Sequence, residues 1–282
     1  DWSSACALPI YDGVVILNSI KGIKVIKEDD DNVYIKVGSG ENWDNFVSFC
    51  VKNHYYGIEN LSLIPGSVGA APIQNIGAYG VEVKTFIESV NGIDINDLKE
   101  KKFDNKSCLF EYRSSIFKNK FKDKFFITSV DFKLNKKENF NLSYKDLNNL
   151  DKNNITIDLL RNKIIEIRNS KLPNPSELGN AGSFFKNPLV ERNTIDKIKK
   201  EYIDLISFEE KKKFKIPAAW LIEKCGWKGY KNKNIGVSDK HALVLVNYGE
   251  RSGEKLKRLS DDIIKDVKNK FDLELEPEVN II

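Results

Sequence analysis

The 282-residue chain contains no methionine, only two histidines and four cysteines. The cysteines Cys6, Cys50, Cys108 and Cys225 are widely spaced and form no Cys-x-x-Cys pair. No zinc or other metal site is therefore expected, and the pattern favours four free thiols in a reducing compartment. Because methionine is missing even at position 1, the sequence indicates that the true start of the protein is absent.

The chain also lacks any run of eighteen apolar residues and any charged-then-apolar leader. These absences argue against a membrane span and a signal peptide, so we expect a cytoplasmic location. The net charge of +4 comes from lysines that acids and apolar residues interrupt. Solvated faces are therefore expected rather than a nucleic-acid surface, and the mildly positive field favours an anionic substrate. The length suits two compact domains.

Periodic patterns predict a mixture of helices and strands. Apolar residues recur at helical spacing over residues 41–53, 157–169, 194–206, 218–224 and 253–271. Alternating or β-branched patterns predict strands at 14–18, 33–40, 126–134, 241–247 and the C-terminal end. Pro173 and Pro175 mark a domain boundary after the second of these helices.

The segment 63–83, LIPGSVGAAPIQNIGAYGVEV, holds four glycines and two prolines but only one charge. Glycine permits positive φ and close approach, so Gly66, Gly69, Gly77 and Gly80 are expected to expose backbone N–H groups toward a phosphate or another electron-rich ligand. The alternative is a set of tight turns between strands. The apolar residues between the glycines favour a buried loop, whose backbone groups a bound cofactor would satisfy.

This segment closely resembles the flavin-binding loop of the UDP-N-acetylenolpyruvoylglucosamine reductases. Seven further motifs of that family follow in the same order, and the resemblance covers about residues 14–282. They are CLFEYRSSIFK at 108–118, LSYKDL at 142–147, KLPNP at 171–175, GNAGSFFKNP at 179–188, AAWLIEKCGWKG at 218–229, HALVLVN at 241–247 and LEPEV at 275–279.

The resemblance implies an α+β fold: an FAD-binding lobe of the vanillyl-alcohol-oxidase-like type and a C-terminal α+β substrate-binding lobe. We expect the FAD-binding lobe at 1–172, joined by a C-terminal strand at 273–282, and the substrate-binding lobe at 173–272. The implied activity is NADPH-dependent reduction of UDP-N-acetylglucosamine enolpyruvate to UDP-N-acetylmuramate through FAD, in peptidoglycan synthesis. No nucleic-acid or membrane partner is expected, and the chain is expected to be a monomer.

Three catalytic roles follow from the resemblance. Ser183 occupies the proton-donor position of the family, and its small neighbours allow close approach to the substrate; its alternative role is a helix N-cap. Arg113 matches an arginine that holds the substrate carboxylate, for which a guanidinium fork is well suited; its alternative is a surface salt bridge. Glu278 matches the catalytic glutamate. Glu276 lies on the same strand face, and a solvated acid is the alternative for either.

The resemblance also assigns binding residues. Tyr144, Lys171 and Asn187 match residues that contact the nucleotide sugar, and Tyr144 places the chain in the form of the family with a tyrosine loop. Without the family match, the sequence predicts a half-buried aromatic, a solvated amine and a turn asparagine at these positions. His241 precedes a predicted strand, and it is either a residue near the site or a structural histidine. The residues expected to contact FAD are Gly66, Ser67, Val68, Gly69, Ile76 and Gly77.

The chain departs from the family at its beginning. It has DWSSACALPI where relatives carry a GGGSN-like turn for the FAD pyrophosphate, and Ala70 and Ala71 stand where relatives often have hydroxyl residues. A chain without that turn is expected to lose pyrophosphate contacts. Two alternative functions remain: a truncated, non-catalytic UDP-sugar-binding fragment, or another FAD-dependent oxidoreductase.

Overall fold

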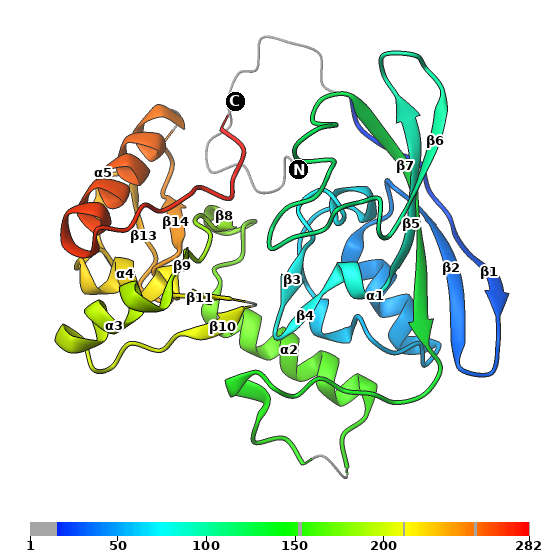
Figure 1. Ribbon diagram of the computed structural model, residues 1–282, viewed down its shortest axis with the longest axis horizontal. Helices are drawn as coiled ribbons and strands as arrows, with labels where there is room; N and C mark the ends of the chain where they lie inside the picture. The colour runs from blue at the N-terminus through cyan, green and yellow to red at the C-terminus, as the bar shows by residue number, and fades with distance from the viewer. Residues whose placement is uncertain (1–15, 152–153, 211, 251–252, 282) are drawn as a thin grey trace. The chain divides into compact units, whose positions relative to one another are not determined.

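The computed structural model describes residues 16–151, 154–210, 212–250 and 253–281 (Figure 1). Residues Val14–Arg168 form one compact unit, here called the N-terminal unit, and Asn169–Ile282 belong to a second, the C-terminal unit. The division falls in the last turn of helix α2 (Ile157–Lys171), shortly before the predicted boundary. Helices and antiparallel sheets in both units confirm the expected α+β class.

The N-terminal unit is built on a five-stranded sheet with the strand order β1-β2-β7-β5-β6, in which all neighbours are antiparallel. The central strand β7 confirms the strand predicted for 126–134 and buries Val130, Phe132 and Leu134, but Ser129 and Asp131 on its other face are buried as well. The strands are β1 (Ile23–Glu28), β2 (Asn32–Gly38), β5 (Ile87–Asp94), β6 (Glu100–Asp104) and β7 (Phe125–Asn135). Residues 16–18 of the strand predicted at 14–18 form no strand, and residues 14 and 15 lie outside the described ranges.

Helix α1 (Trp43–Lys52) confirms the helical pattern of 41–53 and packs aromatic rings onto the sheet. The ring of Phe132 lies 4.7 Å from that of Phe46 and 6.1 Å from that of Trp43, measured between centroids. Asn42 caps the helix, because its Oδ1 accepts a hydrogen bond of 3.0 Å from the N–H of Asn45. Burying each of these aromatic side chains stabilises the fold by roughly 1.5–3 kcal/mol.

Short elements connect α1 to the rest of the sheet and to α2. They are the 3₁₀ turns η2 (Glu59–Leu61), η3 (Val68–Ala70), η4 (Val83–Thr85) and η5 (Lys145–Leu147), and the strands β3 (Gly77–Ala78) and β4 (Val81–Glu82). Strands β3 and β4 form a two-residue hairpin whose turn residues have positive φ, 48° at Tyr79 and 83° at Gly80. Such a pair of angles matches the twist of a tight hairpin.

The C-terminal unit contains an antiparallel sheet of order β12-β13-β14-β8, a smaller sheet of order β10-β11-β9, and helices α3, α4 and α5. The predicted helices at 218–224 and 253–271 are confirmed, whereas the predicted helix at 194–206 begins earlier and ends at Glu201. The elements are β8 (Gly179–Ser183), β9 (Leu189–Val190), α3 (Arg192–Glu201), β10 (Phe208–Glu210), β11 (Lys213–Lys215), α4 (Ala218–Lys224), β12 (Lys231–Asn232), β13 (Ile235–Val237), β14 (Val244–Asn247) and α5 (Gly253–Phe271).

The segment after α5 packs within the C-terminal unit, and not in the N-terminal unit as the sequence led us to expect for 273–282. Leu273 and Leu275 are buried in the core of the C-terminal unit. Phe185 and Pro277 form an isolated β-bridge, and the N–H of Lys186 donates to the carbonyl of Glu276 at 2.9 Å. The described part of this segment therefore runs beside the residues that follow β8.

We expect Gly69→Ala to lower the free energy of unfolding by about 1–3 kcal/mol. A Cβ atom at Gly69 would lie 2.6 Å from the Cβ of Ser39 and 3.1 Å from its carbonyl oxygen, so the backbone would have to shift. Urea denaturation measures the effect. Gly253→Ala is the control, because nothing lies within 4 Å of its Cβ position, and it should be neutral or stabilise α5 by up to about 1 kcal/mol. Equal unfolding midpoints for Gly69→Ala and the wild type would contradict the packing argument.

Candidate active site

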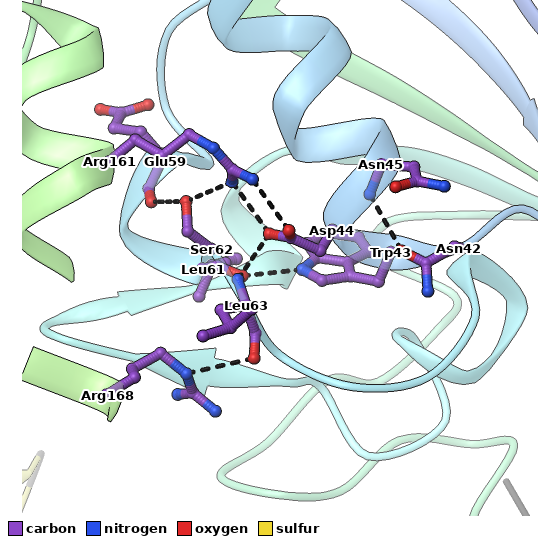
Figure 2. Close-up of polar contacts among 10 residues, drawn as sticks. All are labelled: Asn42, Trp43, Asp44, Asn45, Glu59, Leu61, Ser62, Leu63, Arg161 and Arg168. Carbon is purple, nitrogen blue, oxygen red and sulfur yellow. Dashed lines mark hydrogen bonds and ion pairs between the residues drawn. The ribbon is translucent and has the colours of Figure 1, made fainter. Parts of the chain in front are cut away.

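The glycine-rich loop, residues 63–83, is held at its start by the end of β2 and the beginning of α1. The carbonyl of Leu61 accepts a hydrogen bond of 2.8 Å from Trp43 Nε1, and the N–H of Leu63 donates to Asp44 Oδ1 at 2.6 Å (Figure 2). Further along, the N–H of Val68 donates to the carbonyl of Glu41 at 2.9 Å. A buried loop needs partners for its backbone groups, and here the protein itself supplies several of them.

Three of the four glycines are explained by backbone shape and packing. Gly66 has φ of 114° and its carbonyl accepts from the N–H of Trp43, while Gly80 occupies the turn of the β3–β4 hairpin. The N–H of Gly69 donates to the carbonyl of Ser39 at 2.8 Å. The expectation that all four glycines present N–H groups to a ligand is therefore wrong for Gly69, and the tight-turn alternative describes Gly80.

Arg113 lies against the glycine-rich loop. Its Nη2 donates to the carbonyl of Gly77 at 2.6 Å and its Nη1 to the carbonyl of Asn75 at 3.4 Å. Arg113 itself has φ of 52°, a conformation that few non-glycine residues adopt and that often marks functional sites. The structure thus brings together Arg113 and Gly77, which the sequence assigned to the substrate and to FAD.

Tyr144 lies beside the β3–β4 hairpin, next to Tyr79. Their ring centroids are 5.0 Å apart in an edge-to-face arrangement, and Tyr144 is 38% exposed. Burial raises the pKa of Tyr79 to about 12, against the opposing effect of Arg168, so this hydroxyl stays protonated at neutral pH. The tyrosine assigned to the substrate is therefore in contact with the glycine-rich loop.

The exposed apolar side chains and the nearby guanidinium of the glycine-rich loop fit a flavin ring. Ile73 is 39% exposed and Ile76 is half-buried, which leaves apolar surface for an aromatic ring system. Arg113 supplies a guanidinium at Gly77, a suitable partner for an oxygen that gains negative charge. Gly77, Ile76 and the exposed backbone around them are thus the residues of this loop that would meet the ring.

Ser183 is the last residue of β8, and its side chain is exposed. It pairs with Val244 of β14, so the alternative role of helix N-cap is wrong. Both backbone groups of the following residue, Phe184, form hydrogen bonds. Its N–H donates to the carbonyl of Leu243 at 2.8 Å, and its carbonyl accepts from the N–H of Glu278 at 2.7 Å. This pairing brings the backbones of Ser183 and Glu278 close together.

The two candidate acids at the C-terminal end differ in their surroundings. The carboxylate of Glu276 forms an ion pair with the ammonium of Lys186. Glu278 is the acid whose backbone bonds next to Ser183. The structure therefore favours Glu278 over Glu276 as the acid near Ser183, in line with the family motif.

Lys171 and Asn187 have different neighbours in the structure. Lys171 ends α2 and lies near His241: burial lowers the pKa of His241, and the charges of Lys171 and Lys228 lower it further. His241 Nδ1 accepts from the N–H of Leu243 at 3.2 Å, which places the proton of the neutral ring on Nε2. Asn187 Oδ1 instead accepts a hydrogen bond of 2.8 Å from the N–H of Ala218, the first residue of α4.

The structure groups the candidate residues into two sets, one in each unit. Arg113, Gly77 and Tyr144 surround the glycine-rich loop in the N-terminal unit, and Ser183, Glu278 and Lys171 belong to the C-terminal unit. Two cavities, of about 840 and 500 Å³, lie within the N-terminal and C-terminal units respectively, and none of these six residues lines either.

Sequence reasoning missed Asp44, Tyr79, Arg161 and Arg168, which bind or support the glycine-rich loop. One signal was available. Arg161 and Arg168 are seven residues apart in a predicted helix, so they lie on the same face, beside its apolar stripe.

Comparison with known proteins identifies the family. A family model described as "FAD binding domain" matches residues 2–97, and one described as "UDP-N-acetylenolpyruvoylglucosamine reductase, C-terminal domain" matches residues 174–282. A protein of that reductase name from Flavobacterium johnsoniae is 46% identical over 96% of this chain and 82% of its own length, and one from Bacteroides fragilis (strain YCH46) is 45% identical with the same coverage. The chain belongs to the UDP-N-acetylenolpyruvoylglucosamine reductase family.

Other relatives agree with this assignment. The reductase of Porphyromonas gingivalis (strain W83) is 44% identical over 99% of this chain and 84% of its own length. The crystal structure of the reductase from Thermus caldophilus shares the fold, with a TM-score of 0.59 and 21% identity, and covers 87% of this chain and 71% of that one. As a member of this reductase family, the chain is an FAD-dependent oxidoreductase with NADPH as reductant.

In the parts of the chain that the structure describes, none of the helices has the length and apolar character needed to cross a membrane. In the same parts, no three His, Cys, Asp or Glu side chains come close enough to hold a metal ion.

We expect Asn187→Ala to lower the free energy of unfolding by about 1–3 kcal/mol, because the buried N–H of Ala218 loses its hydrogen-bond partner. Thermal unfolding of the purified variant measures this. Asn193→Ala, on the exposed start of α3, is the control and should have little effect. A variant with wild-type stability but a raised KM for the nucleotide sugar would show that Asn187 acts only on the substrate.

Proposed function

We propose that this chain reduces UDP-N-acetylglucosamine enolpyruvate to UDP-N-acetylmuramate, with NADPH as the source of electrons. The observation that carries the proposal is the exposed hydroxyl of Ser183 at the end of β8, beside a backbone that is fixed by Leu243 and Glu278. The wider support is the identity of 44–46% with reductases of this name over at least 96% of the chain.

The reaction needs a hydride, a proton and stabilisation of negative charge. When bound, FAD would supply the redox chemistry, which is hydride transfer from NADPH to the double bond of the substrate. Ser183 donates a proton to the neighbouring carbon. A serine hydroxyl is a weak acid, so it must be held against the intermediate, and Gly182, with φ of 68°, lets the backbone turn directly before it.

The substrate carboxylate gains charge during the reaction, and Arg113 binds it. The bond from Nη2 to Gly77 fixes the orientation of the guanidinium. A guanidinium is planar and its geometry matches a carboxylate. Glu278 acts on the same intermediate, while Tyr144 and Lys171 bind the nucleotide sugar. In this proposal FAD binds the glycine-rich loop of the N-terminal unit.

The proposal also covers the oligomeric state, the partners and the cellular location of the protein. The chain acts as a monomer, without a nucleic-acid or membrane partner. NADPH and UDP-sugars are cytoplasmic metabolites, so we place the reaction in the cytoplasm.

An absorbance spectrum tests the proposal directly. The purified chain is incubated with FAD and desalted, and we expect a retained flavin band that NADPH bleaches and the enolpyruvyl nucleotide sugar restores. A colourless protein that still binds a UDP-sugar would support a non-catalytic fragment instead. A flavin band that NADPH bleaches, but that only a different acceptor restores, would point to another FAD-dependent oxidoreductase.

For Ser183→Ala we expect normal reduction of the flavin by NADPH and a loss of about 10²–10⁴-fold in the rate of reoxidation by the substrate, because a general acid contributes that much. Stopped-flow absorbance separates the two half-reactions. Ser176→Ala is the matched control, since Ser176 is also exposed and its hydroxyl bonds to Asn174 in a turn. Unchanged reoxidation in Ser183→Ala would remove Ser183 as the proton donor.

A further inference from the structure

The first residue of the glycine-rich loop, Leu63, is held in a left-handed conformation with φ of 57°. Leucine has a Cβ that clashes with the backbone there, so an unsupported chain disfavours this conformation by a factor of roughly 5–30. Leu63 therefore needs support from its surroundings if the chain is to enter the loop in this direction.

Asp44, in the first turn of α1, supplies that support. Its Oδ1 accepts the N–H of Leu63 at 2.6 Å and Arg161 Nη1 at 2.9 Å, and its Oδ2 accepts Arg161 Nη2 at 2.8 Å (Figure 2). Burial raises the pKa of Asp44, but the bonds from Arg161 and Leu63 outweigh burial and hold the pKa below its usual value. The carboxylate is therefore ionised at neutral pH, and the two bonds from Arg161 fix its plane.

The neighbouring groups hold the same short stretch of backbone. Arg161 Nη1 also donates to Ser62 Oγ at 2.9 Å, and this hydroxyl donates to the carbonyl of Glu59 at 2.6 Å. Arg168 Nε donates to the carbonyl of Leu63 at 3.2 Å. Both backbone groups of Leu63 are thus bound by charged side chains, one from α1 and one from α2.

This support reaches further into the loop. The charge of Arg168 also acts on Tyr79, where it opposes the rise in the pKa of the hydroxyl, and the ring of Tyr79 packs against Tyr144. The side chains that hold Leu63 are therefore linked to the β3–β4 hairpin at the far end of the loop.

We propose that Asp44, held by Arg161, is a positioning residue of the flavin site, which keeps Leu63 left-handed and thereby sets the backbone of the glycine-rich loop. The inference rests on the proposed function in one respect, that FAD binds this loop. An ordinary structural salt bridge would contribute to stability alone. Substitution of a positioning residue must also weaken FAD binding. That weakening must disappear when residue 63 is one that adopts the left-handed conformation freely.

The test is a double-mutant cycle with Asp44→Asn and Leu63→Gly. FAD affinity is measured by flavin fluorescence, and hydrogen exchange of residues 61–69 is measured without FAD. We expect Asp44→Asn to weaken FAD binding about 5–30-fold and to speed exchange, because the left-handed Leu63 loses its support. Leu63→Gly in the Asp44→Asn background should restore most of the affinity, since glycine adopts this conformation freely. Asp44→Glu keeps the charge on a longer side chain, so its FAD affinity should lie between those of the wild type and Asp44→Asn.

Asp94→Asn is the matched control. Asp94 is also a buried carboxylate, paired with Lys101 at 2.6 Å, but it lies at the end of β5 and makes no bond to the loop. It should lower the unfolding midpoint and leave FAD affinity unchanged.

If Asp44→Asn does not fold, Asp44→Glu with and without Leu63→Gly provides the same comparison. Wild-type FAD affinity in the Asp44 variants, or a loss that Leu63→Gly fails to relieve, would overturn the inference and leave the proposed function standing. A wild-type chain that binds no FAD would overturn both.

Discussion

The glycine-rich loop depends on one constraint: a chain segment buried without regular secondary structure must find partners for its backbone groups. Several of these partners come from the junction between β2 and α1. Ser39 and Glu41 accept backbone N–H groups of the loop, and the backbone N–H of Trp43 donates to the carbonyl of Gly66. The core packing of α1 on Phe132 therefore also fixes the loop, because the residues that bind it precede or begin that helix.

Charged side chains bind further backbone groups of the loop. Arg113 and Arg168 both donate to carbonyl oxygens of the loop, and Arg161 reaches it through Asp44. Carbonyl oxygens orient a guanidinium without cancelling its charge, so such bonds suit a cation that must later meet an anion. Arg161 differs from Arg113 in these contacts, because the carboxylate of Asp44 accepts hydrogen bonds from both of its Nη atoms.

Elements with strong periodicity were predictable from the sequence, and those stabilised by distant contacts were not. Helices α1 and α5 and strand β7 follow amphipathic patterns, and the structure confirms them. Strand β5 was missed because it is buried on both faces and includes Ser89, whose hydroxyl bonds to Asp131 on β7, so no alternation of apolar and polar residues marks it. The predicted helix at 194–206 ends early, since Ile203 and Ile206 are exposed rather than part of an apolar face.

The same distinction explains the candidate site. The types of residue at positions 113, 183 and 278 can be read from motifs, but the reason for a glycine at position 69 is the approach of Ser39, thirty residues earlier, which no local pattern contains. The ion pair of Glu276 with Lys186 and the backbone bond of Glu278 to Phe184 likewise join residues about ninety positions apart. Spacing along the chain identifies the residue types that a site contains. The partners that each of them meets are decided by contacts that only the folded chain brings together.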